Sequence, residues 1–274
     1  MVWIILLSIG LFAGAIGSLV GLGGGVIVVP ALLYFGTSTS WLEGINPQTA
    51  VGTSLFIMIF TGLSSTLAYL KYKRVDYKSG LIFFAGSGPG SIVGAWFNKD
   101  LNMEDFNLYF GFFMIVTAII LMIRDKLKPV NLFRDASYQR SFTDPNGKTF
   151  TYGFPPMVGT VIAFAVGFAS GLFGIGGGSL MVPAMILIFL FPPHVAVATS
   201  MFMVFLSALV SSGTHIYLGN VKWLYALVLI PGAWSGARIG SFLNTKLESK
   251  TLVNILRIIL IIMGIRLIYQ GIVG

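Results

Sequence analysis

The sequence predicts an all-α polytopic membrane protein built from two five-segment repeats, and its composition is the first observation behind that prediction. Of 274 residues, 56% are hydrophobic and only 9% are charged, with a mean hydropathy of +0.89. A soluble domain carries about 25% charged residues, so this chain cannot cover its own surface with polar groups. The apolar runs have helical length, about 20 residues, and lack the alternating pattern of an outer-membrane barrel.

The second observation is the order of the apolar segments along the chain. They fall at 2–20, 25–36, 48–70, 79–97, 106–123, 155–173, 178–191, 194–218, 222–243 and 251–272. A polar, basic stretch at 124–153 separates the first five from the last five. We therefore expect a first transmembrane repeat over 1–123, a linker over 124–153 and a second repeat over 154–274. Met1–Val20 has no basic leader, so we expect a membrane segment there and no cleaved signal.

The third observation is a set of landmarks that recur in the same order in both halves. They are GLGGGVIVVPAL (21–32) with GIGGGSLMVPAM (174–185), NPQTAVGTSLF (46–56) with PPHVAVATSMF (192–202), GSIVG (90–94) with GARIG (236–240), and Asn98 with Asn244. Three matching strings in one order indicate an internal repeat.

An odd number of segments per repeat predicts that the second copy enters the membrane from the opposite side, and loop charge agrees with this. The loop Lys71–Lys78 holds four basic residues and one acid, and the linker 124–153 holds six basic and three acidic residues. Basic loops face the cytoplasm, so we place both inside. Inverted repeats in the cell membrane, with both termini outside, follow from this placement.

The linker itself has the pattern of a small hairpin. Asp144-Pro-Asn-Gly147 is a strong turn signal, and it lies between Tyr138–Phe142 and Thr149–Tyr152. Two short strands are therefore predicted on the cytoplasmic side, as a connection and not as a catalytic domain.

The glycine strings predict a break in the membrane helices. The first two segments span about 35 residues, whereas two full crossings need about 40 plus a turn. Each string is thus expected to join a broken or re-entrant hairpin whose second helix directs free N–H groups toward the protein interior. The candidate substrate-binding glycines are Gly23, Gly24, Gly25, Gly176, Gly177 and Gly178. The alternative is that glycines only allow close helix packing, which we favour for the outlying pairs Gly10/Gly14 and Gly236/Gly240.

The second duplicated string supplies polar side chains at matching depths. Asn46-Pro47 and Pro192-Pro193 are typical helix starts. The candidate substrate-binding residues on these helices are Asn46, Gln48, Thr53, Ser54, His194, Thr199 and Ser200. Two alternatives remain open: the hydroxyls bond to carbonyls of their own helix, and a single histidine at a helix start is a structural hydrogen-bonding group.

Charge inside the apolar segments is rare. Arg238 lies within the ninth segment, where it either pairs with an anionic substrate or extends to the cytoplasmic surface. No Asp or Glu falls inside an apolar segment, which argues against a carboxylate proton relay or a sodium site. With no cysteine and two histidines, we expect no metal, no cofactor and no enzymatic activity. The net charge of +8 is typical of cytoplasmic anchoring and not of nucleic-acid binding.

The paired glycine strings, the Asn-Pro-Gln-Thr-Ala-Val-Gly-Thr-Ser string and the Gly-x-x-x-Gly pattern resemble the sulfite exporter TauE/SafE family over nearly the whole chain outside the linker. The resemblance implies an inner-membrane permease that exports sulfite or a small organosulfonate such as sulfoacetate. We expect alternating access around a midplane site shared by the repeats. A channel or carrier for another small organic anion is the alternative. The expected partners are the anion, the lipid bilayer and a second copy in a homodimer. Pro192-Pro193-His194 departs from Asn46-Pro47-Gln48, so the two halves of the site differ chemically.

Overall fold

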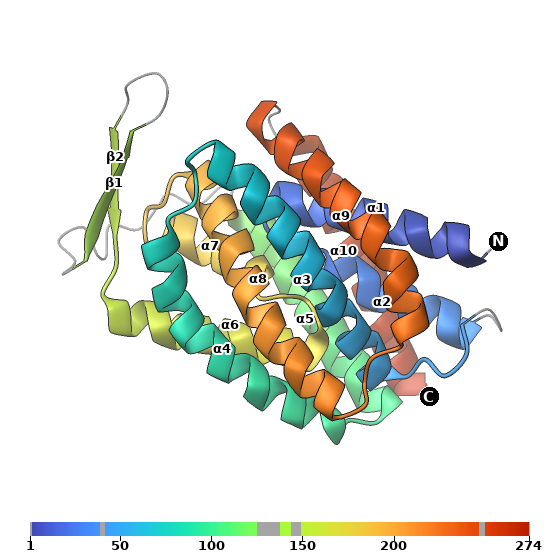
Figure 1. Ribbon diagram of the computed structural model, residues 1–274. Helices are drawn as coiled ribbons and strands as arrows, with labels where there is room; N and C mark the ends of the chain where they lie inside the picture. The colour runs from blue at the N-terminus through green and yellow to red at the C-terminus, as the bar shows by residue number, and fades with distance from the viewer. Residues whose placement is uncertain (1, 39–41, 125–137, 144–148, 247–249, 274) are drawn as a thin grey trace.

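The computed structural model describes residues 2–38, 42–124, 138–143, 149–246 and 250–273. Within these ranges the elements are α1 (Val2–Val20), α2 (Gly25–Ser38), α3 (Pro47–Lys71), α4 (Tyr77–Lys99), α5 (Met103–Arg124), β1 (Gln139–Thr143), β2 (Thr149–Gly153), α6 (Pro156–Phe173), α7 (Gly178–Leu187), α8 (Pro193–Tyr217), α9 (Trp223–Lys246) and α10 (Lys250–Val273). Each helix lies where an apolar segment predicts one. Figure 1 shows the helices gathered into one bundle, with α3 and α8 near its centre.

Eight of the described helices are long and apolar enough to cross a membrane, whereas α2 and α7 are shorter apolar helices. At 14 and 10 residues, α2 and α7 rise only about 21 and 15 Å. The predicted fold class, an all-α polytopic membrane protein, is confirmed. The predicted helix break at each glycine string is also present, because α1 ends at Val20 and α6 ends at Phe173.

The strands β1 and β2 pair as an antiparallel hairpin in which Gln139 lies opposite Gly153 and Thr143 lies opposite Thr149. The predicted turn residues lie in 144–148, outside the described residues. In Figure 1 the hairpin and the turn between α3 and α4 lie at one end of the bundle, and both chain termini lie at the other. We call these the hairpin end and the terminal end.

Helices of one half pack on helices of the other half. The main pairs are α1 with α9, α4 with α6, α3 with α8, and α5 with α10. At the α1–α9 contact the backbones nearly touch: a Cβ atom on Gly14 would lie 2.3 Å from the Ala233 carbonyl oxygen, and one on Gly236 would lie 2.1 Å from that of Leu11. The packing interpretation of the outlying glycine pairs is therefore confirmed at this interface.

Aromatic packing fixes the hairpin to the bundle. Phe154 follows β2, is fully buried and stacks on Phe83 of α4 with ring centroids 4.7 Å apart. It also contacts Phe189, which follows α7, at 5.0 Å. The residue after the hairpin is thus held by both halves of the protein, so the hairpin has a defined place at this end.

Candidate substrate site at the crossed glycine turns

Each glycine string forms a tight turn that leaves a helix start inside the protein. The turn residues with left-handed backbone are Gly21, Gly23, Gly24, Gly174, Gly176 and Gly177, with φ between +67° and +95°. Residues with a Cβ atom rarely adopt this conformation, which explains the glycine runs. Both turns are buried. The first N–H groups of α2 and α7 have no acceptor within their own helix, and they carry the positive end of the helix dipole.

The two turns cross and touch. A Cβ atom on Gly25 would lie 2.0 Å from the Gly174 carbonyl oxygen, and one on Gly178 would lie 1.9 Å from that of Gly21. Two serines hold this crossing: Ser54 Oγ donates to the Gly174 carbonyl at 2.9 Å, and Ser200 Oγ donates to the Gly21 carbonyl at 2.8 Å. Each serine therefore binds the glycine turn of the other half. Ser54 and Ser200 occupy corresponding positions in the two halves, and so do their acceptors Gly174 and Gly21.

Two apolar side chains, Met58 of α3 and Val204 of α8, fill the space beside the crossing. Cβ atoms placed on Gly23 and Gly176 would lie 2.2 and 1.8 Å from Met58 Cε, and 2.9 and 3.3 Å from Val204 Cγ1. Both side chains are buried. The crossing is therefore packed by protein atoms in this conformation, and a substrate would have to displace the flexible thioether of Met58.

The two threonine hydroxyls have partners away from the crossing. Thr53 Oγ1 accepts a hydrogen bond from the Lys222 N–H just before α9, and Thr199 Oγ1 accepts one from the Asp76 N–H just before α4, each at 3.0 Å. The serine of each Thr-Ser pair therefore bonds to a glycine turn, and the threonine bonds to the backbone at the start of a neighbouring helix.

Replacing Thr199 by valine is expected to lower the free energy of unfolding by about 2 kcal/mol, because it leaves the buried Asp76 N–H without an acceptor. Thr214→Val on the same helix is the matched control, since Thr214 Oγ1 bonds only to the Val210 carbonyl one turn earlier. Thermal unfolding in detergent, followed by circular dichroism, compares the two variants. Equal losses would contradict the assigned role of Thr199.

The polar residues predicted at the helix starts lie at the bundle ends and do not join the crossing. Asn46 caps α3 through the N–H three residues on, as predicted. Gln48 Nε2 donates to the Asn98 carbonyl at 2.9 Å, and His194 Nδ1 lies 3.3 Å from Asn244 Oδ1. Asn46 thus stabilises the start of its own helix, whereas Gln48 and His194 connect the ends of different helices in this conformation.

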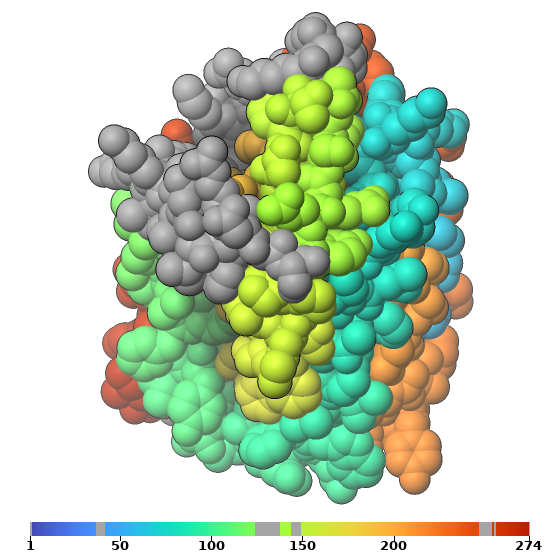
Figure 2. Space-filling view, turned by 90° about the vertical axis from the view of Figure 1, so that its left-hand side faces the viewer, coloured from blue at the N-terminus to red at the C-terminus, as the bar shows by residue number. Residues whose placement is uncertain are grey.

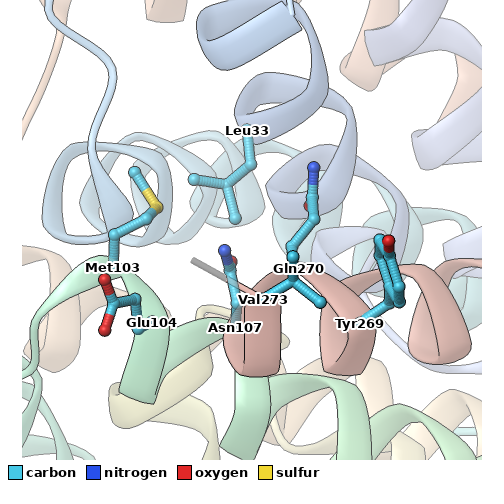
Figure 3. Close-up of a pocket in the computed structure, with 7 residues that line it drawn as sticks. All are labelled: Leu33, Met103, Glu104, Asn107, Tyr269, Gln270 and Val273. Carbon is cyan, nitrogen blue, oxygen red and sulfur yellow. The ribbon is translucent and has the colours of Figure 1, made fainter.

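Arg238 also lies apart from the crossing, in a cavity between α3 and α9. A further cavity of about 320 Å³ lies between α2, α5 and α10. Figure 3 shows the Asn107 amide reaching from α5 toward Leu33 of α2 across that space. Asn107 Oδ1 is buried without a hydrogen-bond partner in the described part of the chain. The described residues that line the cavity between α2, α5 and α10 include none of the predicted substrate-binding residues.

Sequence reasoning missed Ser179, the second residue of α7. Its side chain is fully buried, and its hydroxyl has no hydrogen-bond partner among the described residues. This buried hydroxyl is therefore free to donate a hydrogen bond to a bound group. The only signal in the sequence is that Ser179 directly follows the second glycine run, at the position where the first half has Val26.

Sequence reasoning also missed an ion pair between partly exposed Arg140 and buried Asp76 that joins the hairpin to α4. Asp76, the N-cap of α4, is 5% exposed. Its Oδ2 accepts a hydrogen bond from the Tyr152 hydroxyl at 3.0 Å, and its Oδ1 lies 3.2 Å from Arg140 Nη2. Figure 2 shows the hairpin, in yellow-green, beside the cyan segment that contains the α3–α4 turn. Because Asp76 N–H also binds Thr199, the hairpin is linked to α8 through one residue.

The charges in this cluster support one another. Burial raises the pKa of Tyr152, and the neighbouring Asp76 carboxylate raises it further, so the hydroxyl stays protonated and donates. Burial acts to lower the pKa of Arg140, but the Asp76 carboxylate outweighs it and the pKa is raised. The guanidinium therefore stays charged wherever the carboxylate is ionised.

Among the described residues, eight helices long and apolar enough to cross a membrane, two shorter apolar helices and two crossed buried turns are typical of a polytopic membrane transporter. Two comparisons place the chain within that class. The family model described as "Sulfite exporter TauE/SafE" matches residues 6–267, and the chain belongs to this family.

Relatives with curated names agree with the transporter class. The chain is 55% identical over 272 residues to the "Probable membrane transporter protein YunE" of Bacillus subtilis strain 168, which covers 99% of both chains. It is 28% identical over 264 residues to a "Probable membrane transporter protein" of Xylella fastidiosa strain Temecula1, covering 96% of this chain and 93% of the relative. It is 28% identical over 277 residues to the "Probable membrane transporter protein MJ0441" of Methanocaldococcus jannaschii, covering 95% and 93%. No solved structure matches the chain.

Proposed function

We propose that this transporter carries a small sulfur-containing anion, sulfite or an organosulfonate such as sulfoacetate, out of the cell through the inner membrane. The supporting observation is the reciprocal pair of bonds from Ser54 to Gly174 and from Ser200 to Gly21. They bring two buried turns, two helix starts and two hydroxyl donors to one place. Helix starts and hydroxyls are suitable donors for an anion, and the family description names sulfite.

The proposed mechanism is alternating access around the crossing. In the described conformation both serine hydroxyls are bonded to carbonyls, so binding requires them to turn toward the anion. The Met58 side chain would move aside in the same step. The matched contacts in the two halves support a motion of one half against the other, as in other transporters with inverted repeats.

The proposed orientation places the hairpin end in the cytoplasm and both termini outside. It rests on the basic residues at the hairpin end, which include Lys71, Lys73, Arg74, Lys78 and Arg140. With a negative interior, one charge gains about 2.3 kcal/mol per 100 mV, which drives a monoanion outward about fiftyfold. Export in this direction needs no coupling ion.

Replacing both serines, Ser54→Ala with Ser200→Ala, is expected to reduce sulfite flux in proteoliposomes by about a hundredfold. A hydrogen bond to a charged group contributes about 1.5–3 kcal/mol, so each hydroxyl accounts for about a factor of ten. Flux is measured with an imposed potential, and sulfite, sulfoacetate, sulfate and acetate are compared on the same protein.

Ser235→Ala is the matched control, because the Ser235 hydroxyl bonds to the Pro231 carbonyl of its own helix and the residue is exposed. The unfolding temperature of each variant is measured, so that lost flux is separated from lost fold. Undiminished sulfite flux in a folded double variant would overturn the assigned site. Preference for acetate would assign the transporter to carboxylates, and flux that rises without saturation would assign a channel.

A further inference from the structure

The cavity between α3 and α9 differs from the crossing in position and chemistry. Its volume is about 520 Å³. Among its lining residues are Ser64, Lys71, Tyr72, Trp234, Arg238 and Phe242. Lys71 is the last residue of α3, so the cavity opens at the hairpin end. Two of its lining residues are hydrogen-bonded to each other, with Ser64 Oγ donating to the Trp234 carbonyl at 2.9 Å. Ser64 lies seven residues before Lys71, about 10 Å deeper along the helix.

Two basic side chains line this cavity without a partner of opposite charge. Lys71 and Arg238 are both exposed, and neither makes an ion pair within the described part of the chain. Arg238 lies two turns before the end of α9, on a helix whose neighbouring Ile239 and Phe242 are 48% and 46% exposed. An arginine on such an apolar surface requires a counter-charge or water. No described residue supplies this counter-charge, so both basic side chains are available to a bound anion.

The apolar residues that line the α3–α9 cavity, together with its two basic residues, suit an amphipathic ligand. Tyr72 and Phe242 are 45% and 46% exposed beside the two charges, and Trp234 lies deeper. Aromatic residues at this position are typical of the level of lipid headgroups. Leu67, also in the lining, is 47% exposed and continues the apolar surface toward the middle of α3. The cavity thus combines two basic side chains near the helix ends with an apolar surface that continues toward the middle of α3.

The other half of the protein shows that the fold does not require these charges. The positions that correspond to Lys71 and Arg238 are Tyr217 and Ile92. Both residues are exposed, at 82% and 37%, and both are uncharged. The pair of basic residues is therefore particular to the α3–α9 side.

We propose that this cavity binds the headgroup of an anionic phospholipid. The phosphate lies between Lys71 and Arg238, and an acyl chain follows Leu67 and Phe242. Basic pockets between membrane helices at the cytoplasmic side are suited to anionic headgroups. The site is separate from the crossing, so it does not depend on which ion is transported.

Native mass spectrometry of the full chain in detergent tests the site, with phosphatidylglycerol and phosphatidylcholine of equal chain length as probes. Wild-type protein is expected to retain phosphatidylglycerol at a lower lipid concentration than phosphatidylcholine. Each basic residue near the surface contributes about a factor of five, so Lys71→Gln with Arg238→Gln is expected to weaken phosphatidylglycerol binding about thirtyfold. Phosphatidylcholine binding is expected to change little.

Lys99→Gln is the matched control. Lys99 also lies beside an aromatic ring, with Nζ 5.8 Å from the Trp96 centroid, but it is the last residue of α4 and lies away from the hairpin end. This variant is expected to bind phosphatidylglycerol like wild type. Lys71→Gln alone, at an exposed helix end, is tested in case the double variant is unstable, and a fivefold loss is expected. Equal retention of both lipids by wild type, or unchanged binding by the variants, would overturn the proposal. Displacement of phosphatidylglycerol by millimolar sulfite would instead assign the cavity to the transported anion.

Discussion

Gly178→Ala is expected to lower the free energy of unfolding by about 3 kcal/mol or more and to abolish transport. The new Cβ atom would lie 1.9 Å from the Gly21 carbonyl oxygen and 2.9 Å from Ser200 Oγ. Neither backbone turn can move without breaking the crossing. The expected loss in free energy of unfolding is therefore at the upper end of the range for overpacked cores. For a chain of this length the unfolding temperature falls by roughly 10 °C, measured by circular dichroism in detergent.

Gly213→Ala is the matched control for this prediction. Gly213 lies within α8, and a Cβ atom there would meet no heavy atom within 4 Å. Alanine is the better helix former, so stability should stay the same or rise by up to about 1 kcal/mol. Gly25→Ala should behave like Gly178→Ala, since its Cβ atom would lie 2.0 Å from the Gly174 carbonyl. A stable and active Gly178→Ala protein would show that the turns do not touch as described.

Asp76→Ala is expected to lower the free energy of unfolding by about 3 kcal/mol. The change removes the N-cap of α4, which contributes about 1 kcal/mol, and leaves the buried Tyr152 hydroxyl without an acceptor, which costs about 1–3 kcal/mol. Arg140 is 30% exposed, so water partly compensates its lost partner and the ion pair adds little. Thermal unfolding in detergent measures the total effect.

Lys222→Ala tests the specificity of that loss, because Lys222 is at the corresponding position of the second half. Only its backbone N–H binds Thr53, and alanine keeps that group. The expected change is below about 0.5 kcal/mol. Asp76→Asn retains an oxygen for the N-cap, so its loss in free energy of unfolding should lie between those of Asp76→Ala and Lys222→Ala. If Asp76→Ala and Lys222→Ala behaved alike, the hairpin contact would contribute nothing to stability.

Helix positions could be predicted from the sequence because each apolar run is long and ends in a clear signal. Asn46-Pro47 begins α3 as a capped helix, and the glycine runs end α1 and α6. The hairpin strands were also readable, since a strong turn signal lies between two short runs of strand-forming residues. These are local signals, and the helix signals occur a second time in the other half of the chain.

The arrangement of the site was less predictable because it depends on contacts between distant residues. The sequence could not show that Ser54, rather than its neighbour Thr53, reaches the opposite turn, because adjacent helical residues point about 100° apart. Met58 carries no motif, and its place beside both turns follows only from how α3 and α8 cross. Asp76 is the N-cap of α4, and no local pattern in the sequence indicates that the hairpin residue Tyr152 lies beside it.

The cluster around Asp76 breaks the correspondence between the halves. Thr53 and Thr199 hold corresponding helix starts, but only the start of α4 is also bound by the hairpin through Arg140 and Tyr152. Under alternating access the inward-facing and outward-facing states would exchange the roles of the halves, and two identical halves would populate them equally. Under the proposed mechanism, a contact present in one half alone would make these populations unequal, and the linker would then favour the state in which Asp76 binds Arg140 and Tyr152.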